Sequence, residues 1–280
     1  MARRTPDAQE NSKQPTTGFL GNLHFYANRY NLTLDLSGVT YLTTDAIAAL
    51  VATLVPFTRI PVFVRGSLPK DAAAQTMLVG SGFFDHFRSV QPIPPKLSGQ
   101  IQQERSRKVQ PDVARDLIHW GIKSISGKAM KCTPAYRVLI ECMLNTHNHA
   151  AKEGARRETW WATVYADHGR KRVCFTFVDA GLGIFRSIRL RRLQMIYRRL
   201  GFRTDAAILR DMLLGKVESS TGISYRGKGL PSIYKLSQGG MIKSLVIIAN
   251  DVYADVSAGV YKTLSVAFRG TLLYWEIDVH

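Results

Sequence analysis

Three side chains that could take part in chemistry lie on one face of a predicted helix in the second half of the chain. Glu141, Asn145 and His149 recur every four residues, so a helix would present all three on one side. The Asn145 carboxamide oxygen can bind Mg²⁺, and the Glu141 carboxylate one turn earlier can orient or deprotonate a water molecule. Taken alone, this spacing also fits the solvated face of an ordinary amphipathic helix.

A second motif, Asp179-Ala-Gly181-Leu-Gly183, directly follows the apolar run Val173–Val178. Such a run predicts a central strand, and ligands bind at strand ends of this kind in open α/β sheets. The Asp179 carboxylate can accept a hydrogen bond from an adenine amino group, while Gly181 and Gly183 permit close approach of the backbone. A tight turn capped by aspartate is the structural alternative.

A third motif, Gly227-Lys228-Gly229-Leu230, precedes a predicted helix around Ile233–Leu236. Backbone N–H groups of a glycine-rich loop at a helix start can hold phosphate groups. Lys228 could add a positive charge, although a solvated lysine fits equally well. The spacing is not that of a P-loop, which disfavours that nucleotide fold. Together the three motifs make ATP with Mg²⁺ the first ligand to consider.

The order of these motifs resembles the GHKL superfamily, the ATP-binding fold of gyrase-type topoisomerases, mismatch-repair proteins, heat-shock chaperones and histidine kinases. The resemblance covers about Asp112 to Ile277. It implies a general base, a magnesium ligand, an adenine site and a phosphate site. Glu141 would be the general base and Asn145 the magnesium ligand. The adenine site would comprise Asp179, Gly181, Gly183 and Thr271. The phosphate site would comprise Gly227, Lys228, Gly229 and Leu230.

The same resemblance implies that residues 185–225 form a lid over bound nucleotide. We find no histidine-containing dimerisation helix, which disfavours an autophosphorylating histidine kinase. A glutamate at the position of Glu141 also occurs in domains that bind ATP but hydrolyse it very slowly.

The N-terminal part alternates predicted strands and helices and therefore indicates a small α/β domain. It resembles STAS domains, on the segment Leu34–Leu42 and the turn Gly80-Ser-Gly82-Phe83-Phe84. In signalling members the loop before the helix carries a phosphorylatable serine, whereas Asp45 stands at that place here. The resemblance therefore implies that the phosphorylation switch is missing. The plainer interpretation of Asp45 is a cap or first-turn acid of the helix.

Periodicity and turn residues predict the remaining elements. In the N-terminal domain we expect strands over 32–36 and 61–64 and helices over 46–55 and 71–79. A proline linker at 91–95 leads to a helical connector over 100–126, and a helix opens at 133–134. The predicted strands are 160–166, 172–178, 245–249, 260–268 and 271–277, with a turn at Arg269-Gly270.

We therefore expect an α/β protein built from two-layer α+β sandwiches. A disordered tail spans 1–18, a STAS-like domain 19–92, a linker and connecting helix 93–130, and an ATP-binding domain with a mixed sheet 131–280. The chain has 280 residues, of which 45% are apolar. Its 3 cysteines show no metal-ligand spacing and predict reduced thiols. We find neither an apolar run of membrane-spanning length nor a secretory signal, so a cytoplasmic location is expected.

The chain is strongly basic, because 38 Lys and Arg against 21 Asp and Glu give a net charge of +17. Such a field attracts nucleic acid, anionic membrane surface or acidic protein. The densest cluster follows the second motif, and a solvated helix face fits it as well as a binding surface. It comprises Arg186, Arg189, Arg191, Arg192, Arg198, Arg199 and Arg203.

The expected function is a Mg²⁺-ATP-binding regulatory switch, either a slow ATP hydrolase or a serine/threonine kinase-like enzyme. Its arginine-rich lid would control contact with a protein partner, and a homodimer is compatible with the sequence. One alternative is a non-catalytic regulator that sequesters a partner in a nucleotide-dependent, anti-sigma-like way. The other is a basic nucleic-acid-binding protein, although no recognition motif for a specific sequence is evident.

Overall fold

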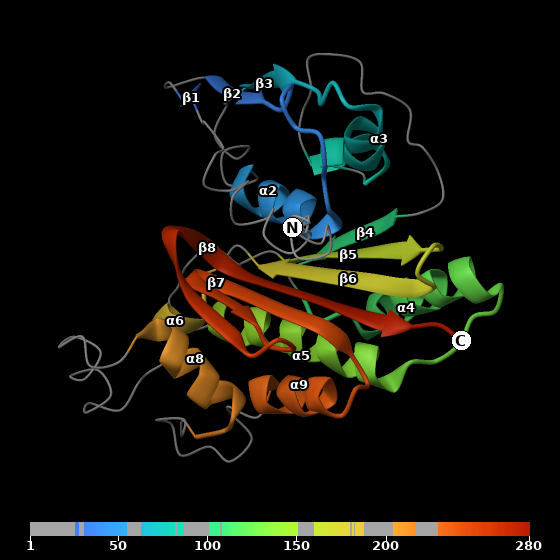
Figure 1. Cartoon of the computed structure of the whole chain (residues 1–280), viewed down its shortest axis with the longest axis vertical. Helices are drawn as coiled ribbons and strands as arrows, with labels where there is room; N and C mark the ends of the chain where they lie inside the picture. Colours follow the sequence, from blue (N-terminus) through green and yellow to red (C-terminus); the bar gives the residue numbers. More distant parts are fainter. Residues whose placement is uncertain are drawn as a thin grey trace, which may run out of the picture.

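Two β-sheets with a helix between them organise the chain (Figure 1). The computed structural model describes residues 26–27, 31–54, 63–81, 83–86, 101–106, 108–150, 160–179, 181, 183–187, 204–216 and 229–280. The tail predicted at 1–18 and the linker predicted at 91–95 lie outside these ranges. Helices and strands both occur throughout the described residues, which confirms the mixed α and β content of the predicted class. Within these ranges, no helix combines the length and apolarity needed to cross a membrane.

The N-terminal unit, formed by the described residues between 26 and 86, contains the smaller sheet. Strand β2 lies between β1 and β3, antiparallel to β1 and parallel to β3. Of the strand predicted at 61–64, residues 63 and 64 are described and belong to β3, which continues to Ser67 because Gly66 and Ser67 pair with Leu34 and Asp35. The elements are β1 (Tyr26–Ala27), β2 (Asn31–Asp35), α2 (Thr44–Leu54), β3 (Phe63–Ser67), α3 (Ala72–Gly80) and the 3₁₀ helix η3 (Phe83–His86).

The larger sheet has five strands in the order β4-β5-β6-β8-β7, and every neighbouring pair is antiparallel. The prediction of a mixed sheet is therefore wrong for the described strands. Residues 101–106 also differ from the predicted helical connector, because they pair along β5 as an edge strand. The strands are β4 (Ile101–Ser106), β5 (Trp160–Asp167), β6 (Arg172–Asp179), β7 (Lys243–Asp255) and β8 (Val260–Asp278).

Strand β8 runs without a break through the turn predicted at Arg269-Gly270. The pairing with β7 shifts there, from Ala249 opposite Thr271 to Asn250 opposite Phe268. The shift leaves residues 269 and 270 as a bulge, and Gly270 takes a φ of 117°. A bulge and a turn both favour glycine, which is why the sequence signal was misread.

Helices cover one face of this sheet, the lower face in Figure 1. They are α4 (Pro111–Ser126), α5 (Thr133–Ala150), α6 (Ile184–Ser187), α8 (Asp205–Leu213) and α9 (Gly229–Gln238). Gly121 lets α4 approach closely, since a Cβ there would lie 2.6 Å from Val173 Cγ1. Helix α8 falls within the predicted lid, yet it buries Ile208, Leu209 and Leu213 in the main core. That part of 185–225 is therefore a packed element of the fold.

Helix α2 of the N-terminal unit covers the opposite face of the five-stranded sheet (Figure 1). Its Leu50 and Leu54 are completely buried, in one cluster with Trp161, Val178 and Leu272 of the sheet. The same cluster contains residues of β2 and α3. A single apolar core therefore joins the N-terminal unit to the larger sheet.

This shared core predicts that damage to α2 destabilises the whole molecule. We expect Leu50→Ala to lower the free energy of unfolding by about 2–5 kcal/mol, the usual cost of a large-to-small change in a core. All 4 tryptophans lie outside the N-terminal unit, so tryptophan fluorescence during urea unfolding reports on the larger sheet. The matched control is Leu214→Ala, whose side chain is 39% exposed. A fluorescence midpoint unchanged by Leu50→Ala would contradict the shared core.

Candidate functional site

Helices α5 and α9 bring the first and third sequence motifs together. Val138, Leu139 and Met143 are completely buried and hold α5 on the sheet, which leaves Glu141 and Asn145 partly exposed. Gly229 is the first residue of α9, and a Cβ built on it would lie 2.8 Å from Glu141 Oε2 and 3.5 Å from Asn145 Nδ2. The start of α9 therefore lies against the carboxylate and the carboxamide, and a side chain at position 229 would require Glu141 to shift.

The pairing of β6 with β8 brings Asp179 and Thr271 side by side. These residues are directly opposite in the antiparallel register, so their side chains emerge on the same face of the sheet. Val178 and Leu272 belong to the cluster under α2. Because side chains alternate along a strand, Asp179 and Thr271 must lie on the other face, where α5 and α9 pack.

The loop after β6 combines a tight turn with close backbone packing. The Gly181 N–H donates to Asp179 Oδ1 at 2.9 Å, so the turn foreseen as the structural alternative is present. Gly183 has a φ of 77°, in the left-handed region that favours glycine. A Cβ on Gly183 would lie 2.4 Å from Asn250 Oδ1 of β7. Sequence reasoning missed Asn250, because a polar residue inside a strand pattern carries no signal of this contact.

The negative charges of Glu141 and Asp179 both act on one buried thiol, that of Cys142. Cys142 follows Glu141 on α5 and is 3% exposed. Burial raises the pKa of the Cys142 thiol well above its usual range, and the negative charges of Asp179 and Glu141 raise it further. Both carboxylates therefore lie within electrostatic range of one sulfur atom. Helix α5 also contacts β6 directly.

Oxygen donors of this region suit a hard divalent cation. A carboxylate and a carboxamide one turn apart match the ligands that Mg²⁺ takes in proteins, alongside phosphate oxygens and water. The missing Cβ of Gly229 keeps space beside both side chains. No cluster of three or more His, Cys, Asp or Glu side chains able to hold a metal occurs within the described ranges.

Several predicted site residues lie outside the part of the chain that the structure describes. They are Gly227 and Lys228, and the arginines between 189 and 203. The side chains of Asp45, His149 and Arg186 are likewise not described. Leu230 follows Gly229 in α9, and its side chain packs against the main core. Its place in the phosphate site stays a prediction.

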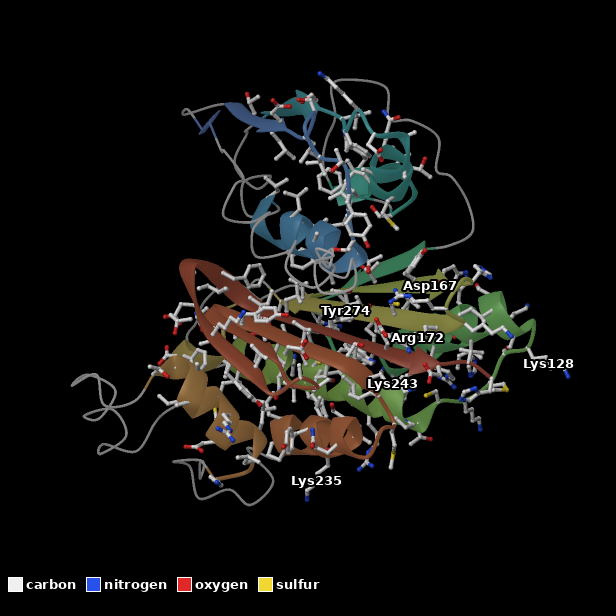
Figure 2. The ribbon with its side chains drawn as sticks, in the orientation of Figure 1. Lys128, Asp167, Arg172, Lys235, Lys243 and Tyr274 are labelled. Carbon is white, nitrogen blue, oxygen red and sulfur yellow. The ribbon has the colours of Figure 1, made fainter. Side chains whose placement is uncertain are left out.

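A second polar cluster occupies the far end of β6 and was not foreseen (Figure 2). Glu276, 3% exposed, accepts hydrogen bonds from Tyr274 Oη at 2.6 Å, Arg172 Nη1 at 2.8 Å and Ser244 Oγ at 3.1 Å. Burial raises the pKa of Tyr274 well above its usual range. Arg172 also pairs with Asp278 at 3.1 Å. These mutual contacts tie β6, β7 and β8 together and identify the cluster as a structural network.

Comparison with known proteins adds no family assignment. No protein-family model matches the sequence, and no characterised protein matches it significantly. The geometry described above is therefore the basis for the function proposed below.

The burial of the cysteines predicts their chemical reactivity. Cys142 and Cys174 are 3% and 2% exposed, whereas Cys132 is half-buried. Burial also raises the pKa of the Cys174 thiol to about 12, so little thiolate forms at pH 8. We expect Ellman's reagent at pH 8 to modify Cys132 alone in the native protein, and all 3 thiols after denaturation. Cys132→Ser should abolish the native reaction. Modification of Cys142 without unfolding would contradict the packing of α5 on β6.

Proposed function

We propose that this chain is a Mg²⁺-ATP-binding protein of the GHKL type, preceded by a STAS-like unit. The observation that carries this proposal is that residues of three motifs far apart in the sequence lie on the helix-covered face of the larger sheet. Glu141 and Asn145 on α5 meet the N-terminal residue of α9. Asp179 stands opposite Thr271 on the face that these helices cover. Its negative charge also raises the pKa of the thiol of Cys142, the residue after Glu141.

Adenine recognition would belong to the strand pair. A carboxylate oxygen has two lone pairs, so an aspartate that shapes its own loop can also accept from an adenine amino group. Asp179 fulfils the first task through Gly181, and Thr271 can contribute a hydroxyl beside it. Guanine presents a carbonyl oxygen where adenine has its amino group, so the Asp179 carboxylate would disfavour GTP.

The phosphates would lie at the start of α9. N–H groups of the first helical turn lack partners within the helix and attract anions. Gly229 removes the side chain that would otherwise crowd this point beside Glu141. Asn145 would hold Mg²⁺, which neutralises charge on the phosphate oxygens when it is bound.

Glu141 would supply the chemistry of hydrolysis. Its carboxylate can take a proton from a water molecule whose oxygen attacks the terminal phosphorus, while the bond from that phosphorus to the bridging oxygen breaks. A protein hydroxyl in place of water would give a kinase-like transfer by the same proton abstraction. Hydrolysis and kinase-like transfer both require the Glu141 carboxylate to lie beside the bound phosphates, where α9 begins.

A nucleotide-dependent regulator without turnover is the second candidate. The observation that favours it is the core shared by α2 and the strands of the site, because Val178 and Leu272 are direct neighbours of Asp179 and Thr271. Nucleotide binding on one face could thereby alter how the N-terminal unit is held on the other. Contact with a protein partner would then be what the switch controls. Binding to nucleic acid rests on the net charge of +17 alone.

Isothermal titration with Mg²⁺-ATP tests the binding function. We expect saturable binding, and a loss of about 10–100-fold in affinity for Asp179→Asn. The amide oxygen would stay with the Gly181 N–H, so the NH₂ group would face the adenine amino group and leave it unpaired. The matched control is Asp116→Asn on the exposed side of α4, which should bind as the unaltered chain does. Equal affinity in the Asp179→Asn and unaltered proteins would remove Asp179 from the adenine site.

Turnover of radiolabelled ATP separates the enzyme from the regulator. If Glu141 is the general base, Glu141→Ala should lower the hydrolysis rate by about 10²–10⁴-fold while ATP affinity stays within a few-fold. Glu141→Gln, which keeps the shape but not the base, should be equally slow. Equal turnover in all three proteins would exclude Glu141 from the mechanism. Binding without turnover in the unaltered chain would favour the non-catalytic regulator.

A further inference from the structure

Asn250 lies at an irregularity in the pairing of β7 with β8. The register with β8 shifts on both sides of this residue, and its backbone has a φ of 52°, in the left-handed region. Asparagine tolerates this region better than most residues, and a bulge redirects a side chain out of the regular alternation. The shift begins immediately after Ala249, the residue paired with Thr271. Asn250 therefore projects from the sheet beside the strand pair that would read adenine.

The Asn250 carboxamide contacts the loop that follows Asp179. Its Oδ1 accepts a hydrogen bond from the Phe185 N–H at 3.3 Å. The same carboxamide fills the space beside Gly183, where a Cβ would come within 2.7 Å of Cγ and Nδ2 as well as 2.4 Å of Oδ1. The loop is thus fixed at its start by Asp179, through Gly181, and at its end by Asn250.

These contacts link Asn250 to the orientation of the Asp179 carboxylate. Gly183, which the Asn250 carboxamide contacts, is only two residues from Gly181 in the sequence, so a shift of Gly183 would move the Gly181 N–H. That N–H donates to Asp179 Oδ1 and so helps to set the plane of the carboxylate. A hydrogen bond weakens steeply as its donor and acceptor lose alignment. Adenine recognition would therefore depend on a residue that does not itself touch the base.

We propose that Asn250 is a positioning residue that sets the preference of this site for ATP over GTP. This role rests on the function proposed above and extends it to a residue on a third strand. Asn250 holds the loop, the loop aims the Asp179 carboxylate, and the carboxylate selects the amino group of adenine. Removal of the carboxamide should therefore weaken ATP binding more than GTP binding, because only the adenine contact requires the aimed carboxylate.

Asn250→Gly tests the role without backbone strain, since glycine accepts a positive φ. We expect the Kd of Mg²⁺-ATP, measured by isothermal titration, to rise about tenfold or more, the loss typical of a misaligned buried hydrogen bond. The Kd of Mg²⁺-GTP should change less, so that the ratio of the two affinities falls. Asn250→Asp keeps the Oδ1 acceptor and should retain most of the preference for ATP. Lys171→Gly is the matched control, because Lys171 also has a positive φ of 50° but lies in the turn at the far end of β6.

The outcomes distinguish this role from the function on which it rests. Failure of the unaltered chain to bind Mg²⁺-ATP overturns both. Normal binding by the unaltered chain, with an unchanged ratio of ATP to GTP affinity in Asn250→Gly, overturns the role of Asn250 alone. An equal loss for both nucleotides, or a melting temperature that falls while the ratio is preserved, makes Asn250 a purely structural residue. If Asn250→Gly does not fold, Asn250→Ala replaces it, since alanine also removes the carboxamide that accepts from the Phe185 N–H. An unchanged ratio in that variant also overturns the role.

Discussion

The antiparallel pairing of β6 with β8 is the constraint on which the rest of the structure depends. Its register is continuous from Arg172 opposite Asp278 to Asp179 opposite Thr271. Because side chains alternate between faces, this register directs Val178 and Leu272 toward α2. It directs Asp179 and Thr271 toward the helix layer, which is formed by α4, α5, α6, α8 and α9. A slip by one residue would exchange the two sets and would bury a carboxylate under α2. The ion pairs of Arg172 with Glu276 and Asp278 fix the register from the far end.

The two faces of this sheet are covered for different reasons. The helix layer buries a large apolar core that includes the stacked rings of Phe175 and Trp275, whose centroids lie 5.3 Å apart. Helix α2 covers apolar side chains on the opposite face, among them Trp161 and Val178. Without α2 these side chains would form an exposed apolar surface, which soluble domains avoid unless it binds a partner. The N-terminal unit is thus part of the environment of the site, and its position can influence the strands that carry Asp179 and Thr271.

Two glycines show how the site depends on backbone rather than on side chains alone. Gly229 and Gly183 each lie close to a polar side chain, so that a Cβ on either would require this side chain to shift. In both cases the partner comes from a different element, Glu141 on α5 and Asn250 on β7. Close approach of this kind joins elements that share no strand pairing, and it leaves N–H groups near the carboxylates. The site is therefore assembled by packing between elements.

Local sequence determined the helices, most strands and the order of the polar motifs, because period, turn residues and caps act over a few neighbouring positions. The hairpin of β5 and β6 and the start of α9 near Gly229 followed from these signals. The antiparallel order of the large sheet, the edge strand at 101–106 and the bulge at Gly270 did not, since each depends on a partner strand elsewhere in the chain. Tertiary structure alone decided that Thr271 faces Asp179, that Asn250 supports Gly183, and that α2 closes the second face. Contacts of this kind join residues far apart in the sequence, and packing of the whole core selects them.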